Sequence, residues 1–146
     1  GINDTTAVVV PGDGGLWQVI GDGGVALIRR GTKATTARLE GFSISLLNAG
    51  DRFDPSTGRI VIAPTRKPVA MGRDPRAPPV EINAIFEPDR VRALILALAQ
   101  SESLAAAGYD DASRMAVRLR KRPDSAAYGD GSSLSVLHLE LAIAPS

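Results

Sequence analysis

Polar and apolar residues alternate along several short stretches of this chain, and one stretch alone repeats its apolar residues at helical spacing. Residues 80–86, 115–122 and 133–144 alternate with a period of two, the pattern of strands that bury one face. Residues 91–99 instead have apolar residues at intervals of three and four, the spacing of one helix face. These apolar residues are Val91, Leu94, Ile95, Leu98 and Ala99. We therefore expect an α+β fold with a mainly antiparallel sheet and one main helix packed on a sheet face.

The amino-terminal half predicts a meander of short strands, followed by a β-α-β-β arrangement. Residues 7–10, 16–20 and 25–30 are β-branched or aromatic runs of strand length, and residues 38–47 alternate weakly. In the carboxyl-terminal half, Pro88 suits the first turn of the helix and Gly108 its carboxyl-terminal cap. The last two strands should pair antiparallel across residues 123–132. Leu119 would then lie opposite Leu137, or the register would shift by one pair.

The tetrapeptide Gly-Asp-Gly-Gly occurs twice, at residues 12–15 and 21–24. A phosphate-binding loop would lead into a helix, whereas each tetrapeptide precedes a predicted strand. A calcium-binding repeat architecture needs at least three copies. Because Asp-Gly and Gly-Gly suit tight hairpin turns, we expect two turns and no cofactor or metal site here.

Residues 64–79 contain five prolines in sixteen positions. Proline cannot donate a backbone hydrogen bond, so this segment should run extended as a connector or arm. Each flank has only about seventy residues, which favours a single domain over residues 1–146. The segment also supplies a basic set that could dock on a partner. This set is Arg66, Lys67, Arg73 and Arg76.

Composition excludes several classes of function. The chain has no cysteine, which rules out disulfides, thiolate catalysis and cysteine-bound metals. Its net charge is +1, so no overall field attracts nucleic acid or anionic lipid. No apolar run approaches the roughly 20 residues that span a bilayer. The sequence begins at Gly1, and a leader removed before this residue would make the protein exported or periplasmic; the residues assign no compartment.

The only histidine, His138, lies on the polar face of the last predicted strand, two residues before Glu140. The first predicted register brings Arg118 opposite His138, and the shifted one brings Arg118 opposite Glu140 and Arg120 opposite His138. Either register makes a charge-complementary outer face. No serine elbow accompanies the histidine, so we expect no catalytic centre. The candidate contacts for a partner or an anion are Arg114, Arg118, Arg120, Arg122, His138 and Glu140.

These observations favour a non-enzymatic interaction or assembly module that binds a protein partner or a second copy of itself, as in envelope, secretion or phage-like complexes. The first alternative is a small-ligand-binding domain, with a site between helix and sheet near Trp17 or Tyr109. The second is weak nucleic-acid or phosphate binding through the basic strand at residues 114–122. No cofactor is expected.

Overall fold

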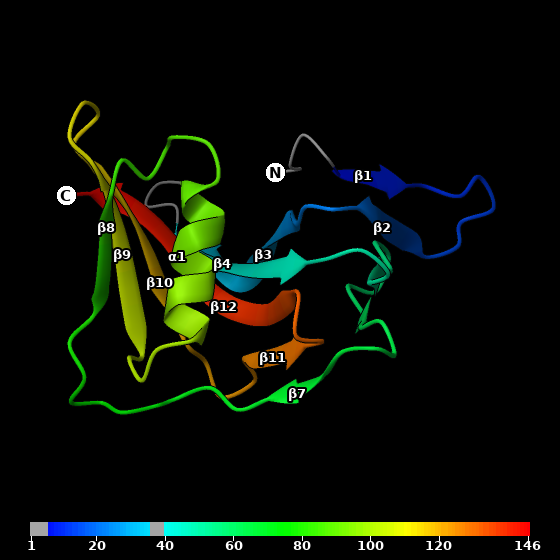
Figure 1. The fold of residues 1–146 in the computed structure, drawn as a ribbon. Coiled ribbons are helices and arrows are strands. Elements are labelled where there is room, and N and C mark those ends of the chain that lie inside the picture. Colours follow the sequence, from blue (N-terminus) through cyan, green and yellow to red (C-terminus); the bar gives the residue numbers. More distant parts are fainter. Residues whose placement is uncertain (1–5, 36–39) are drawn as a thin grey trace.

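The computed structural model describes the backbone of residues 6–35 and 40–146, and the side chains of residues 6–30 and 40–146. The fold is α+β, with one helix on a mixed, largely antiparallel sheet, as expected from the sequence (Figure 1). Its elements are β1 (Thr6–Val9), β2 (Trp17–Gly21), β3 (Val25–Thr35), β4 (Glu40–Leu47), β5 (Arg52–Phe53), β6 (Ile60–Val61), β7 (Lys67–Val69), β8 (Val80–Asn83), α1 (Arg90–Ala99), β9 (Ala105–Asp110), β10 (Met115–Arg120), β11 (Ala126–Gly129) and β12 (Leu134–Pro145).

The larger sheet, here called sheet A, has the strand order β3-β4-β12-β10-β9-β8; β11 pairs with the first half of β12, and β7 pairs with β11. All of its main pairings are antiparallel except that of β8 with β9, which are joined through α1 as a parallel crossover. Sheet A curls around the helix, so that α1 packs inside the curve (Figure 1). A helix connection is the usual way to join two parallel neighbours.

The main hydrophobic core lies between α1 and the concave face of sheet A. Leu94, Ile95 and Leu98 of α1 are fully buried there. They contact apolar residues of β4, β10 and β12, among them Leu119 and Leu139. The predicted helical stripe is confirmed, because its apolar positions all belong to this core. No helix in the described part of the chain is long and apolar enough to cross a membrane.

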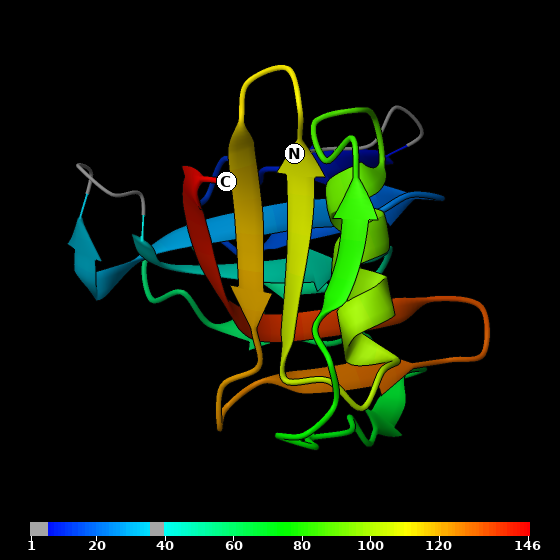
Figure 2. The ribbon, with the colours of Figure 1, turned by 90° about the vertical axis from the view of Figure 1, so that its left-hand side faces the viewer.

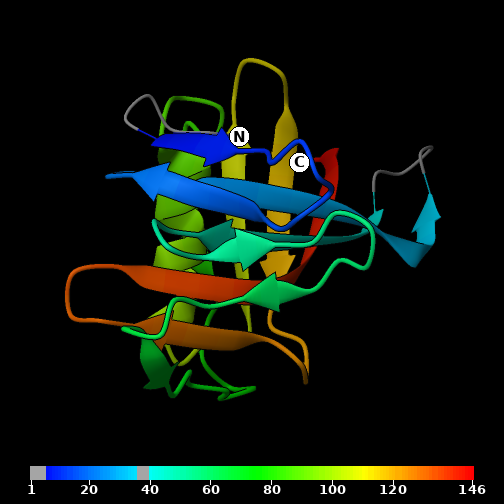
Figure 3. The same ribbon diagram turned by 90° about the vertical axis from the view of Figure 1, so that its right-hand side faces the viewer.

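A smaller sheet, sheet B, has the order β1-β2-β5-β6 and covers part of the convex face of sheet A (Figure 3). A second core, which includes Val19, Leu47 and Leu137, lies between the two sheets. No element of the described residues lies in front of the convex face at β8, β9 and β10 (Figure 2). We call this uncovered surface the open face.

The predicted end of the helix was wrong. The helix ends at Ala99 with Gln100 as its cap, and Gly108 lies within β9. The predicted strand over residues 80–86 also ends early, at Asn83. Ala84 adopts a φ of 56°, so the burial pattern reverses after it: Ile85 is buried and Phe86 is exposed.

Both predicted registers for the last two strands were wrong as well. The connection at residues 123–132 contains an additional strand, β11, which pairs with the first half of β12. Consequently β10 pairs with the second half, where Leu119 lies opposite Leu141 and Arg120 opposite Glu140. His138 lies where β12 passes from β11 to β10, next to a register shift against β4, with a φ of 62°.

The proline-rich segment lies along the surface of the same chain. Its first part forms β7, which pairs with β11, and Asp74 later makes a parallel bridge with Ser103. Nζ of Lys121 donates to the carbonyl oxygens of Gly72 (2.5 Å) and Ser101 (2.8 Å). These contacts attach the extended chain to the end of the helix and to the β10–β11 connection.

Candidate functional site

An apolar pocket of about 410 Å³ lies between the two sheets. Sheet B and its hairpin contribute Val8, Val10, Trp17, Val19 and Phe53, and sheet A contributes Val25, Ala26, Leu27 and Leu47. We call this cavity the inter-sheet pocket. Its lining carries no titratable side chain, so it offers apolar contact area and no acid or base.

Aromatic side chains fix one wall of the inter-sheet pocket. The rings of Trp17 and Phe53 meet edge to face, with centroids 6.2 Å apart and planes at 80°. The guanidinium of Arg29, from sheet A, lies 5.9 Å from the centroid of the Phe53 ring. The same guanidinium occupies the space beside Gly58, where any Cβ would collide with it. Sheet A and the β5–β6 hairpin are therefore held together at this wall.

Two edge strands border the inter-sheet pocket. Within the described ranges, β1 pairs only with β2, and β3 pairs only with β4. The two strands lie at the same side of the stacked sheets (Figure 3). A strand edge presents unpaired backbone donors and acceptors, which can accept another strand. The pocket thus lies beside the edge of β1, which is able to bind an extended segment.

A buried polar network lies next to the inter-sheet pocket. Asp51 is fully buried, and its Oδ1 accepts from the Arg66 guanidinium (2.8 Å) and from the backbone N–H of Ala63 (2.9 Å). Its Oδ2 accepts from the Asn48 N–H and the Ser135 hydroxyl. All the strong acceptor directions of this carboxylate are used, which is the condition for a buried charge to be tolerated.

The open face contains a trough of about 330 Å³. Small side chains from Ala105, Ala107 and Ala142 form part of its floor, flanking the arginines of β10. Arg118 lies between Ala107 and Ala142, and Arg120 lies between Ala105 and Glu140. The Tyr109 hydroxyl donates to Oε1 of Glu81 at 3.4 Å on the same face. Two arginines and two glutamates thus share this face, and their charges balance.

The structure brings together only part of the predicted contact set. Arg118, Arg120 and Glu140 share the open face. Arg114 lies in the turn before β10, with a φ of 56°, and Nε of Arg122 forms a surface ion pair with Asp124 at 3.3 Å. The His138 N–H donates to the Ser45 hydroxyl, and its carbonyl accepts from the Ser125 hydroxyl.

The basic residues of the proline-rich segment have different environments. Arg66 is buried on Asp51, and its Nε also donates to the Ser133 hydroxyl at 3.0 Å. Arg73 donates to the carbonyl oxygens of Arg122 and Ser125 at 2.8 and 2.9 Å. Lys67 and Arg76 are exposed, and Nζ of Lys67 donates to the Pro64 carbonyl.

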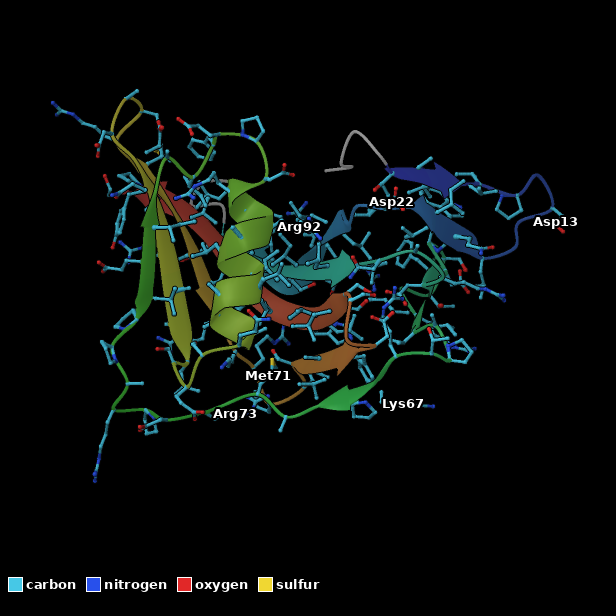
Figure 4. All side chains as sticks on the ribbon, in the orientation of Figure 1. Asp13, Asp22, Lys67, Met71, Arg73 and Arg92 are labelled. Atoms are coloured by element: carbon cyan, nitrogen blue, oxygen red, sulfur yellow. The ribbon has the colours of Figure 1, made fainter. Side chains whose placement is uncertain are left out.

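The aspartates of the two Gly-Asp-Gly-Gly tetrapeptides lie far from each other. Asp13 is in the connection of the β1–β2 hairpin, where its Oδ1 accepts from the Gly15 N–H. A hairpin is found here as predicted, but its connection runs over residues 10–16 and is not a tight turn. Asp22 follows β2 at the other end of that hairpin (Figure 4). The second tetrapeptide joins strands of different sheets and is no hairpin. No group of three acidic or histidine side chains suited to a metal ion occurs among the described residues.

Sequence reasoning placed the ligand site between helix and sheet, and this was wrong for both aromatic residues. Trp17 lies between the two sheets, and Tyr109 lies on the open face away from α1. The inter-sheet pocket is assembled from strands of two sheets that no local pattern links. One signal was available in the sequence. Apolar and polar side chains alternate in both residues 16–20 and residues 25–30, so each segment has an apolar face that must be buried, and the two faces can bury each other.

Comparisons of the chain with protein-family models, with curated proteins and with solved structures found no match. The functional argument therefore depends on the geometry of the surfaces described above.

Proposed function

We propose that this protein is a non-enzymatic interaction module that takes up an extended, apolar segment of a protein partner at the inter-sheet pocket. The observation that carries the proposal is the position of this apolar cavity beside the edge strand β1. Strand addition uses both features together: backbone hydrogen bonds give affinity, and pockets for alternate side chains give specificity.

The distribution of exposed apolar side chains supports the same surface. Val9, Val10, Ile20 and Ile28 all lie on or beside β1, β2 and β3. Val10 is 57% exposed and also lines the inter-sheet pocket, so it stands at the mouth. Exposed apolar side chains beside a cavity are typical of an interaction site.

The charge of the sheet A edge favours a partner that carries acidic residues. Arg29 and Arg30 are exposed neighbours on β3. Antiparallel pairing of β3 with a second copy of itself would bring these arginines close to the same residues of the other copy. Like charges directly opposite each other destabilise strand pairing, which favours a different chain over self-association at this edge.

The test is a selection from displayed ten-residue segments that alternate apolar and polar positions. We expect wild-type protein to select apolar segments that carry acidic residues. Binding should become at least about tenfold weaker in Val10→Lys, because a charge at the mouth opposes entry of apolar side chains. The matched control is Phe86→Lys, since Phe86 is similarly exposed (52%) but remote from β1–β3.

The sole tryptophan, Trp17, supplies the second readout because it lines the pocket. A bound segment should shift its fluorescence and protect backbone amides of β1 or β3 from hydrogen exchange. Selected segments that bind Val10→Lys as tightly as wild type, without changing the Trp17 emission, would refute the proposal.

A further inference from the structure

A groove beside α1 contains a cationic side chain with an unused hydrogen-bond donor. Its volume is about 380 Å³, and one wall is formed by Arg92, Leu96 and Gln100 of α1. Val69 of β7 and the β11–β12 turn, including Leu134, form the rest. We call this cavity the α1 groove.

The helical spacing explains why these three side chains share a wall. Residues 92, 96 and 100 are four apart and therefore lie on one side of α1. The buried stripe around Leu94, Ile95 and Leu98 faces sheet A, so the neighbouring side of the helix faces β7 and the turn. Figure 4 shows Arg92 on α1, with Met71 and Lys67 on the proline-rich segment beneath it.

Arg92 provides the polar feature of the α1 groove. Its Nε atom is buried, and no hydrogen-bond acceptor of the described residues contacts it. The ion pairs found in the described part of the chain use Arg66 and Arg122 instead. A partly buried guanidinium without an acceptor is costly, and an anion in the groove would pair with its accessible N–H groups through charge-assisted hydrogen bonds.

The opposite side of the groove adds apolar surface and few free donors. Leu96, Val69 and Leu134 supply the apolar surface. The N–H and hydroxyl groups of Ser132 and Ser133 already donate to the Asp130 carboxylate. That carboxylate does not line the groove, and it also lies 3.6 Å from Nε of Arg66. A matching ligand therefore has a single anionic group and an apolar body.

We propose that the α1 groove binds a small organic monocarboxylate. Its carboxylate accepts from the Arg92 guanidinium, and its apolar body lies against Leu96, Val69 and Leu134. This site is separate from the inter-sheet pocket, and its ligand does not depend on the function proposed for that pocket.

Hexanoate is the probe, titrated into the full ¹⁵N-labelled chain while amide shifts are followed. We expect saturable shifts at Gly129 and Gly131, which line the groove. Affinity should fall at least about tenfold in Arg92→Gln, which removes the charge-assisted contact. The matched control is Arg76→Gln, because Arg76 is an exposed arginine outside the groove and should leave affinity unchanged.

Two further ligands separate the parts of the proposal. Hexanol tests the apolar body alone and sulfate the anion alone, and both should bind at least about tenfold more weakly than hexanoate. Equal binding of hexanol or of sulfate would overturn the proposal, as would unaltered hexanoate affinity in Arg92→Gln. Shifts confined to the Trp17 indole would move the ligand to the inter-sheet pocket and would overturn it equally. The melting temperature of Arg92→Gln without ligand should match or exceed that of wild type, since the replaced Nε has no partner.

Discussion

Glycine and left-handed residues fix the local geometry at two positions of sheet A. At Gly108 the space above the backbone is occupied by Ile85: a Cβ built there would lie 2.4–2.9 Å from Ile85 side-chain atoms. At His138 a non-glycine residue holds a φ of 62° within β12. Each feature concerns the backbone at one residue, so each can be tested by a single substitution.

Gly108→Ala should destabilise the protein by about 1–3 kcal/mol, because overpacking forces Ile85 or the backbone of β9 to move. Gly12 is the matched control, since a Cβ at Gly12 would meet no atom within 4 Å. Gly12→Ala should change the free energy of unfolding by no more than about 0.5 kcal/mol. Urea unfolding of both variants measures the difference, and equal stabilities would show that Ile85 yields without cost.

His138→Gly should be more stable than His138→Ala by about 1 kcal/mol, because glycine adopts a positive φ without steric cost. The order is reversed at Ala142, an ordinary position of the same strand, where replacement by glycine should cost about 0.5–1 kcal/mol. Thermal or urea unfolding checks both pairs. An advantage of alanine at position 138 would mean that the bulge relaxes when the imidazole is removed.

At the scale of elements, the proline-rich segment is attached to the rest of the molecule largely through polar side chains. Lys121, which is buried, donates to carbonyl oxygens of the segment and of the residues that follow α1. Burial lowers the pKa of the Lys121 ammonium below its ordinary value, and the nearby charge of Arg73 lowers it further. Glu102 acts in the opposite direction. The lowered pKa predicts how this attachment responds to pH.

The unfolded chain holds the Lys121 proton to a higher pH than the folded protein does. The free energy of unfolding should therefore rise with pH between the folded pKa and about 10.4, the ordinary lysine value. NMR of ¹³C-labelled lysine can follow the titration directly, because Lys33, Lys67 and Lys121 are the only lysines. Lys121→Arg identifies the resonance.

We expect the Lys121 resonance to titrate below the ordinary lysine value in the folded protein and to return to it in concentrated urea. In Lys121→Met the rise of stability with pH should disappear across the same window. An ordinary midpoint for Lys121 in the folded state would contradict burial of its ammonium.

The elements that could be predicted have a pattern within their own residues, whereas the elements that could not be predicted depend on pairing with other strands. The stripe of α1 and the alternation of β10 were predictable because each buries one face along its own length. The predicted single inward face of β12 was wrong: Leu139 and Leu141 lie in the main core, whereas Leu137, before the irregularity at residue 138, lies in the second core. β9 begins with three alanines, which favour a helix in isolation, and parallel pairing with β8 overrides that preference. β11 is only four residues long, too short for a local periodicity to mark it, and it pairs with the following strand β12 and with the remote strand β7.

The candidate sites were less accessible to sequence reasoning than the fold. The open-face residues Arg118 and Arg120 could be placed on one side of a strand, and the structure keeps them together. The inter-sheet pocket and the α1 groove combine residues from segments far apart in the chain. Their existence depends on how sheets and helix stack, which a single sequence does not specify locally.

At the scale of the whole molecule, the Asp51 network adds polar contacts between the two sheets, which the second core also joins, and connects them to the proline-rich segment. Asp51 precedes β5 of sheet B, Arg66 precedes β7, and Ser135 lies in β12 of sheet A. The backbone carbonyl of Asp51 also accepts from the Val19 N–H of β2. One buried carboxylate thereby links sheet B, the proline-rich segment and sheet A.

The Asp51–Arg66 pair should behave as a unit in a double-mutant cycle. Arg66→Gln leaves a buried carboxylate without its countercharge, and Asp51→Asn leaves the buried guanidinium with only the more distant Asp130 carboxylate, 3.6 Å from its Nε. Each change should lower the free energy of unfolding by about 3–5 kcal/mol, whereas the double variant should be no less stable than the less stable of the two single variants.

Trp17, on the neighbouring strand β2, reports whether sheet B stays in place, since separation would expose its indole and shift its emission to longer wavelength. Arg122→Gln is the control, because its ion pair with Asp124 is on the surface and should contribute no more than about 1 kcal/mol. Additive losses in the cycle, with unshifted Trp17 emission in every variant, would show that the network contributes local hydrogen bonds without joining the two sheets.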